Sequence, residues 1–159
     1  MKWTHLDDKG RARMVDISQK ESQFRTARAS ARLRVSPQTL EAIGKQAIPK
    51  GQPFEAARLA GIQAAKQTAV LIPLCHQIQL DWIDVEIGFG ENSLEIRSEV
   101  RCRWATGVEM EALTAVAVAA LTLYDMLKAV DKDMAVENIQ LDLKSKTPTA
   151  GRAESPPDQ

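Results

Sequence analysis

The sequence lacks an excess of charge of either sign and has few of the side chains that bind metals. Acidic and basic residues balance at 21 each over 159 residues, so no net field favours nucleic acid or a membrane surface as a partner. Only two cysteines and two histidines are present. Cys75 and Cys102 do not have the spacing of a metal-binding pair, so we expect no metal held by the protein. These scarcities leave a small molecule as the expected partner.

An apolar N-terminal leader is also missing. Lys2, His5, Asp7 and Asp8 stand where a secretion signal would have its apolar core. No run is expected to approach the roughly 20 apolar residues of a membrane-spanning helix, so we expect a cytoplasmic protein. The sequence contains no glycine-rich phosphate loop, no dinucleotide-binding fingerprint and no Ser/His/Asp signature, so these common site types are not indicated.

Hydrophobic periodicity predicts the secondary structure. Period-two alternation predicts strands over 27–35, 83–89, 94–104 and 136–144. Helical spacing and proline boundaries predict a short helix over 37–46 and longer helices over 53–72 and 107–128. A short extended segment is expected over 11–18. Gly61, inside the second helix, indicates a close crossing with a neighbouring backbone.

The order of these elements predicts the fold. Apart from the short helix, it reads strand, helix, strand, strand, helix, strand. This order is typical of an α+β, ferredoxin-like split βαβ fold, in which a four-stranded antiparallel sheet carries two main helices on one face. We expect a single domain over 1–146 with an N-terminal arm over 1–24. The 147–159 segment has prolines and charges but no period, and is expected to be a disordered tail.

The helix over 107–128 carries charge only at its ends. Glu109 and Glu111 lie at its start, and Asp125 and Lys128 share one face at its end. Asp125 follows Glu111 by 14 residues, which corresponds to roughly 21 Å of helix, too far for one small substrate. If both ends serve one site, another copy must supply the second end, most simply through antiparallel helices across a twofold axis. Otherwise only one end is functional, and the remaining charges stabilise the helix dipole or form a solvated pair.

Three further residues could carry chemistry. Lys50 beside Gly51 in a proline-rich loop suits a phosphate contact, although most loop lysines only solvate the surface. Cys75 and His76 combine a thiol with an imidazole, but adjacent residues of an extended chain point in opposite directions, which disfavours a cysteine nucleophile. His76 is better suited to acid/base work or anion binding, with a structural histidine as an equal alternative.

Longer stretches carry a resemblance to a known family. They are MVDIS, the Lys50-Gly51 loop, ARLAGIQAAKQT, LIPLCH, TGVEMEALTAVAVAALTLYDM and KAVDKDM. From about residue 14 to residue 144 the chain closely resembles the molybdenum cofactor biosynthesis protein C family, the cyclic pyranopterin monophosphate synthases. The resemblance implies a lyase that converts 3′,8-cyclo-7,8-dihydro-GTP to cyclic pyranopterin monophosphate and pyrophosphate. It also implies a ferredoxin-like homohexamer, a trimer of dimers with active sites at the dimer interface.

The resemblance also implies which residues act. The implied catalytic residues are Lys50, His76, Glu109, Glu111, Asp125 and Lys128. The implied substrate-binding residues are Asp16, Lys20, Lys50, Leu74, Cys75, His76, Met110 and Glu111. We expect Lys50 and His76 to engage the triphosphate or move protons, and Asp125 and Lys128 to act as general base and acid. No tightly bound cofactor is implied, although a triphosphate substrate could bring Mg²⁺ with it.

Four stretches depart from the family pattern. Gln77 replaces a proline, Gln52-Pro53 replaces Asp-Val, the approach at 104–107 is shortened, and Lys146-Thr147-Pro148 replaces a glycine-rich segment. A second hypothesis therefore stays open. In it, the chain is a catalytically impaired relative that acts as a pterin- or nucleotide-binding or regulatory module.

Overall fold

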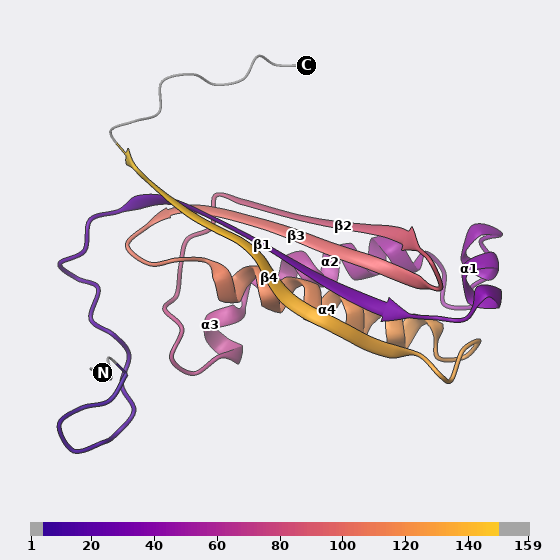
Figure 1. Ribbon diagram of the computed structural model, residues 1–159, viewed down its shortest axis with the longest axis horizontal. Coiled ribbons are helices and arrows are strands. Elements are labelled where there is room, and N and C mark those ends of the chain that lie inside the picture. The colour runs from indigo at the N-terminus through magenta and orange to yellow at the C-terminus, as the bar shows by residue number, and fades with distance from the viewer. Residues whose placement is uncertain (1–4, 150–159) are drawn as a thin grey trace, which may run out of the picture.

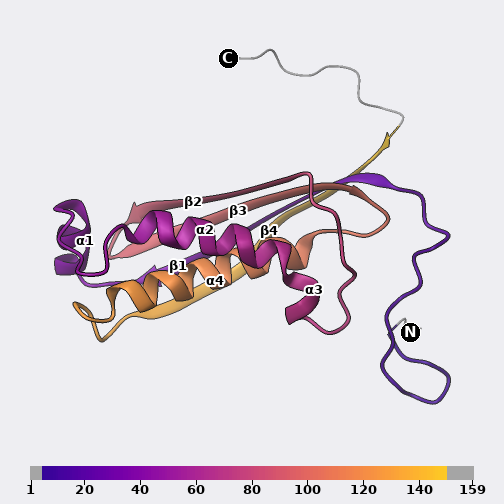
Figure 2. The same cartoon turned by 180° about the vertical axis from the view of Figure 1, so that it is seen from behind.

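Four antiparallel strands form one sheet in the spatial order β2-β3-β1-β4 (Figure 1). The computed structural model describes residues 5–149. Its strands are β1 (Gln23–Arg34), β2 (Trp82–Gly90), β3 (Ser93–Trp104) and β4 (Ala135–Pro148). Its helices are α1 (Pro37–Gly44), α2 (Pro53–Lys66), α3 (Thr68–Leu71) and α4 (Glu109–Leu127). Helices α2 and α4 lie side by side across one face of the sheet (Figure 2), so the predicted ferredoxin-like α+β fold is confirmed.

The two helices pack closely because their contact positions are small. Alternate β1 residues Ala27, Ala29 and Ala31 are buried beneath the helical layer. A Cβ added at Gly61 of α2 would lie 2.9 Å from the Ala115 carbonyl oxygen of α4. The predicted close crossing at Gly61 is therefore confirmed, and it fixes α4 against both α2 and the sheet.

The helix predicted over 53–72 is interrupted. Helix α2 ends at Lys66, and Gln67 has φ −106° and ψ 8° before the short α3 begins. The hydroxyl of Thr68 donates to the carbonyl oxygens of Ala64 and Ala65, at 3.3 and 3.1 Å. This side chain competes with the backbone for the last carbonyls of α2, which is a local effect that hydrophobic spacing does not reveal.

The outer strands are longer than predicted. Strand β4 ends at Pro148, two residues inside the predicted tail, and β1 begins inside the predicted arm. Gln23 pairs with Pro148, and Phe24 pairs with Thr147. Cross-strand pairing holds these ends where the sequence shows no clear period.

The extended segment expected over 11–18 forms no strand beyond the isolated bridge between Leu6 and Ala12. Residues 150–159 of the predicted tail lie outside the described residues.

Helix α4 is the most apolar element. By length and composition alone it could cross a membrane, so the expectation that no run approaches such a span is wrong. Half of its apolar window is buried inside the protein, where α4 packs on α2, β1 and β3. The core of the fold thus accounts for the apolar residues on its inner face, while its charged ends emerge at opposite ends of the molecule.

Candidate active site

A cavity of ≈ 390 Å³ opens at the N-terminal end of α4. The loop after α3, the approach to α4 and the N-terminal arm all contribute to its walls. Its lining residues are His5, Val15, Ile17, Lys20, Leu74, Cys75, His76, Ile78, Thr106, Gly107, Glu109, Met110 and Glu111. Most of the implied substrate-binding residues therefore meet in one place, although they come from three separate parts of the chain.

Glu111 is the buried acid of this cavity. The residue is only 3% exposed. Burial, with a smaller contribution from the neighbouring charge of Glu109, raises the pKa of the Glu111 carboxyl to about 7. A carboxyl that titrates near neutral pH can both hold and release a proton under cellular conditions. Glu111 is therefore suited to acid/base chemistry.

Cys75 is not suited to nucleophilic attack. Burial raises the pKa of its thiol, and the Glu111 carboxylate raises it further. A thiol in such surroundings stays protonated and therefore weakly reactive. This environment disfavours a cysteine nucleophile, and the substrate-contacting role of Cys75 stays a prediction.

The N-terminal arm reaches the cavity through His76. The ring Nε2 of His76 lies 2.8 Å from the carbonyl oxygen of Val15. Lys20 lines the cavity beside it. The carboxylate of Asp16 instead accepts the Ser18 N–H at 2.9 Å, which shapes the arm, and Asp16 is not among the lining residues.

A second cluster lies at the C-terminal end of α4. The Lys50 ammonium lies 2.7 Å from Oδ2 of Asp125 and 2.8 Å from the Asp125 carbonyl oxygen. The Lys128 ammonium lies 2.7 Å from Oδ1 of the same carboxylate. Hydrogen bonds from Lys128 and then Lys50 lower the pKa of Asp125 to about 2, and Asp125 in turn raises the pKa of Lys128. All three side chains are exposed.

The six implied catalytic residues thus form two groups within one chain. His76, Glu109 and Glu111 lie at one end of α4, and Lys50, Asp125 and Lys128 lie at the other. Helix α4 is 19 residues long, and roughly 21 Å of helix separates Glu111 from Asp125. A single chain therefore does not bring the two groups to one small substrate.

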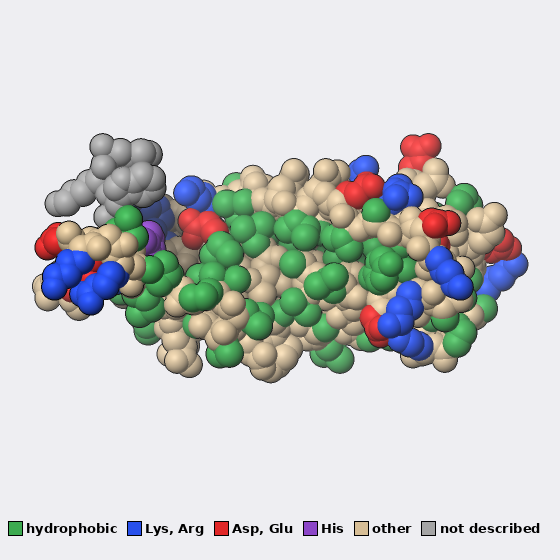
Figure 3. Space-filling model, turned by 90° about the horizontal axis from the view of Figure 1, so that it is seen from below, with side chains coloured by type: hydrophobic (Ala, Val, Ile, Leu, Met, Phe, Trp, Pro, Cys, Tyr) green, Lys and Arg blue, Asp and Glu red, His purple; other side chains and the backbone are tan. Residues whose placement is uncertain are grey.

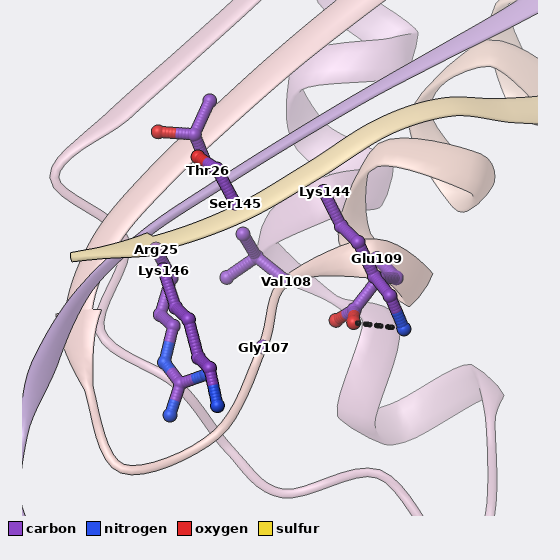
Figure 4. Close-up of a pocket in the computed structure, with 8 residues that line it drawn as sticks. All are labelled: Arg25, Thr26, Gly107, Val108, Glu109, Lys144, Ser145 and Lys146. Carbon is purple, nitrogen blue, oxygen red and sulfur yellow. Dashed lines mark ion pairs between the residues drawn. The ribbon is translucent and has the colours of Figure 1, made fainter.

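A second hollow, of ≈ 320 Å³, adjoins Glu109 and was not predicted from the sequence (Figure 4). Lys144 approaches Glu109, with 3.8 Å between Nζ and Oε1. Arg25 and Lys146 face each other across β1 and β4, and their side chains extend side by side (Figure 4). Arg25 Nε is buried and, within the described part of the chain, has no hydrogen-bond partner. The only sequence signal was the alternation of Lys144 and Lys146, whose pairing with β1 emerges only on folding.

Within residues 5–149, no group of three or more His, Cys, Asp or Glu side chains is arranged to hold a metal ion. The chain is therefore an α+β protein with two separated acid/base clusters at the ends of α4. A cavity and a group of cations adjoin the cluster at its N-terminal end. Such an arrangement suits proton transfer on an anionic small molecule.

Comparison with known proteins identifies the family. The family model of the MoaC family matches residues 14–147, so the chain belongs to the MoaC family. It is 49% identical over 142 residues to a cyclic pyranopterin monophosphate synthase of Streptomyces griseus subsp. griseus, covering 89% of this chain and 80% of that protein. It is 51% identical over 140 residues to the protein of that name from Thermomicrobium roseum, covering 87% and 84%.

A relative with a different architecture is also similar. The chain is 53% identical over 145 residues to a molybdenum cofactor biosynthesis bifunctional protein of Chlorobaculum tepidum. The match covers 91% of this chain but only 46% of that protein. The chain thus spans about half the length of this relative, and most of the length of the two synthases.

Proposed function

We propose that the protein is a cyclic pyranopterin monophosphate synthase of molybdenum cofactor biosynthesis. It would convert 3′,8-cyclo-7,8-dihydro-GTP to cyclic pyranopterin monophosphate and release pyrophosphate, which makes it a lyase. The observation that carries the proposal is the pair of acid/base clusters at the ends of α4, in a chain about half identical to relatives of that name.

The two clusters suit different steps. Ring opening and reclosure both require proton transfer, and Glu111, with a pKa of about 7, can exchange a proton at neutral pH. Lys128, whose pKa is raised, stays protonated and can act as an acid. Asp125, with a pKa of about 2 while two lysines hold it, is a weak base. It becomes an effective base only when the anionic substrate draws Lys50 or Lys128 away.

A second copy of the chain would complete the site. Between Glu111 and Asp125, α4 carries no charged residue, and outward-facing Leu121 is 60% exposed. Ile139, Leu141 and Leu143 of β4 are exposed as well, and hydrophobic side chains gather along this side of the molecule (Figure 3). Two copies with antiparallel α4 helices would bury this surface and bring Lys50, Asp125 and Lys128 of one copy to the Glu111 cavity of the other. We propose that three such dimers form a homohexamer.

The adjoining hollow gives this site a cationic wall. Arg25, Lys144 and Lys146 gather beside Glu109, and three positive side chains there suit the phosphates of a nucleotide-derived substrate. Mg²⁺ would arrive with the triphosphate, and no tightly bound cofactor is needed. We place the reaction in the cytoplasm.

The direct test is turnover by the purified protein. Cyclic dihydro-GTP should yield the cyclic pterin and pyrophosphate in equal amounts, and Lys128→Ala should reduce the rate at least about 100-fold. Folded protein that binds the substrate without forming either product would contradict the synthase proposal. That outcome would favour the pterin- or nucleotide-binding module.

A further inference from the structure

One hydrogen bond connects the N-terminal arm to a reactive side chain. His76 Nε2 and the Val15 carbonyl oxygen lie 2.8 Å apart, in a half-buried position. Val15 and His76 also line the same cavity as Glu111. The arm therefore contacts this histidine through its main chain, 61 residues away in sequence.

The chemistry of this contact sets the position of the ring proton. A carbonyl oxygen only accepts hydrogen bonds, so Nε2 must carry the hydrogen. A neutral imidazole has only one N–H, which leaves the lone pair on Nδ1. Within residues 5–149, Nδ1 of His76 has no hydrogen-bond partner. The ring nitrogen that the arm does not use is thus free for a ligand.

We propose that the Val15 carbonyl is a positioning group that fixes His76 in the Nε2–H tautomer, so that Nδ1 is the proton-accepting atom of the cavity. The neutral ring then takes a proton from a substrate N–H or O–H group, and donates nothing to a phosphate oxygen. Of the two expected roles of His76, contact with the triphosphate and proton transfer, the proposal keeps only proton transfer.

The local structure of the arm supports this role. The Asp16 carboxylate accepts the Ser18 N–H at 2.9 Å, and the Lys20 N–H donates to the Ile17 carbonyl oxygen at 3.0 Å. These bonds form a turn directly after Val15, which holds its carbonyl oxygen in place. Asp16 therefore contributes by shaping the arm, which explains why it lies outside the cavity.

The tautomer can be measured without turnover. The identity of the substrate that gives up the proton rests on the proposed synthase activity, but the tautomer of His76 does not. Full-length protein labelled with ¹⁵N-histidine has only two histidines, and a His5→Gln variant assigns the remaining signals to His76. At a pH where the ring is neutral, we expect a protonated-type Nε2 signal and an unprotonated-type Nδ1 signal. An Nδ1–H tautomer, or averaging between the two forms, would overturn the proposal.

Two substitutions at His76 test the contact with the arm. In His76→Gln the side-chain amide can still donate at the position of Nε2, whereas the shorter amide of His76→Asn cannot reach Val15. The exposed residues Arg11 and Arg13 provide trypsin sites in the arm. We expect arm cleavage several-fold faster in His76→Asn and unchanged in His76→Gln, while both variants lose the basic Nδ1. Equal cleavage rates in the two variants, whether slow or fast, would overturn the proposal.

Discussion

The ionisable residues around α4 differ from one another mainly in burial. Glu111 is enclosed and holds its proton near neutral pH, while Asp125 is exposed between two ammonium groups and stays charged. Their chemical type is the same, so sequence alone gives them the same properties. Burial and neighbours separate their pKa values by several units and thereby divide the work between them.

Glu111 should make stability fall as pH rises. Its ordinary pKa is 4.5, and burial raises it to about 7 in the folded chain. Between these values the folded state binds a proton that the unfolded state has lost, so the free energy of unfolding decreases with increasing pH. In Glu111→Gln we expect the free energy of unfolding to decrease by about 1 to 3 kcal/mol less over this pH range than in the unchanged protein. Urea unfolding at about pH 5 and about pH 8 measures it. Identical pH dependence in the two proteins would contradict the buried-acid assignment.

Asp131 should have the opposite pH dependence. Burial opposes its charge, but hydrogen bonds from Ser36 N–H, the Thr39 hydroxyl and Asp133 N–H outweigh burial and lower its pKa. Its stabilising effect is therefore present above the ordinary pKa of about 3.9 and is lost as pH falls through the lower folded value.

Asp131→Ala leaves these buried donors without their acceptor, and we expect it to cost about 1 to 3 kcal/mol near neutral pH. Asp131→Asn is the matched variant, because it keeps an acceptor without the charge and should cost less. Denaturant unfolding compares them. Equal stability of Asp131→Ala and the unchanged protein would show that the bonds at the start of α1 contribute nothing.

At the scale of elements, periodicity predicted every strand and every main helix. Strands β1 and β3 bury alternate residues beneath the helices, whereas the alternating apolar residues of β4 are exposed. The boundaries that it missed depend on contacts that apolar spacing does not encode, one of them between distant residues and one of them local. The pairing of Gln23 with Pro148 extends two strands, and the Thr68 hydroxyl ends α2. The cationic hollow was missed for the same reason, since Arg25 and Lys146 become neighbours only through the β1–β4 register.

The crossing of α2 and α4 should be intolerant of any side chain at Gly61. A Cβ there would lie 2.9 Å from the Ala115 carbonyl oxygen of α4 and 3.2 Å from Val85 Cγ2 of β2, so Gly61→Ala must push α2 away from both neighbours. We expect a loss of about 1 to 3 kcal/mol, measured by thermal or urea unfolding.

Gly44→Ala is a matched control, because a Cβ at this position in α1 meets nothing within 4 Å. Alanine should be neutral there or add up to about 1 kcal/mol, from its higher helix propensity. If both substitutions had the same effect, the close crossing would not explain the glycine at position 61.

At the scale of the whole molecule, the distance along α4 is the decisive feature. It could be predicted from sequence, because helix geometry is regular and the two charged ends are 14 residues apart. The structure adds that the ends are separate clusters within one chain, connected by an apolar outer surface. Both features are explained if a second copy packs on α4 and the active site forms between copies.

Mixing two inactive variants tests this account most directly. Glu111→Gln disables the cavity end, and Lys128→Ala disables the other end, so each variant alone should have little activity. Co-refolded in equal amounts, half of the dimers would contain one chain of each kind, and each such dimer would have one intact site of two. We predict recovery of about a quarter of the unchanged protein's turnover. Confirmed mixed assemblies that remain as inactive as the separate variants would contradict an active site shared between two copies.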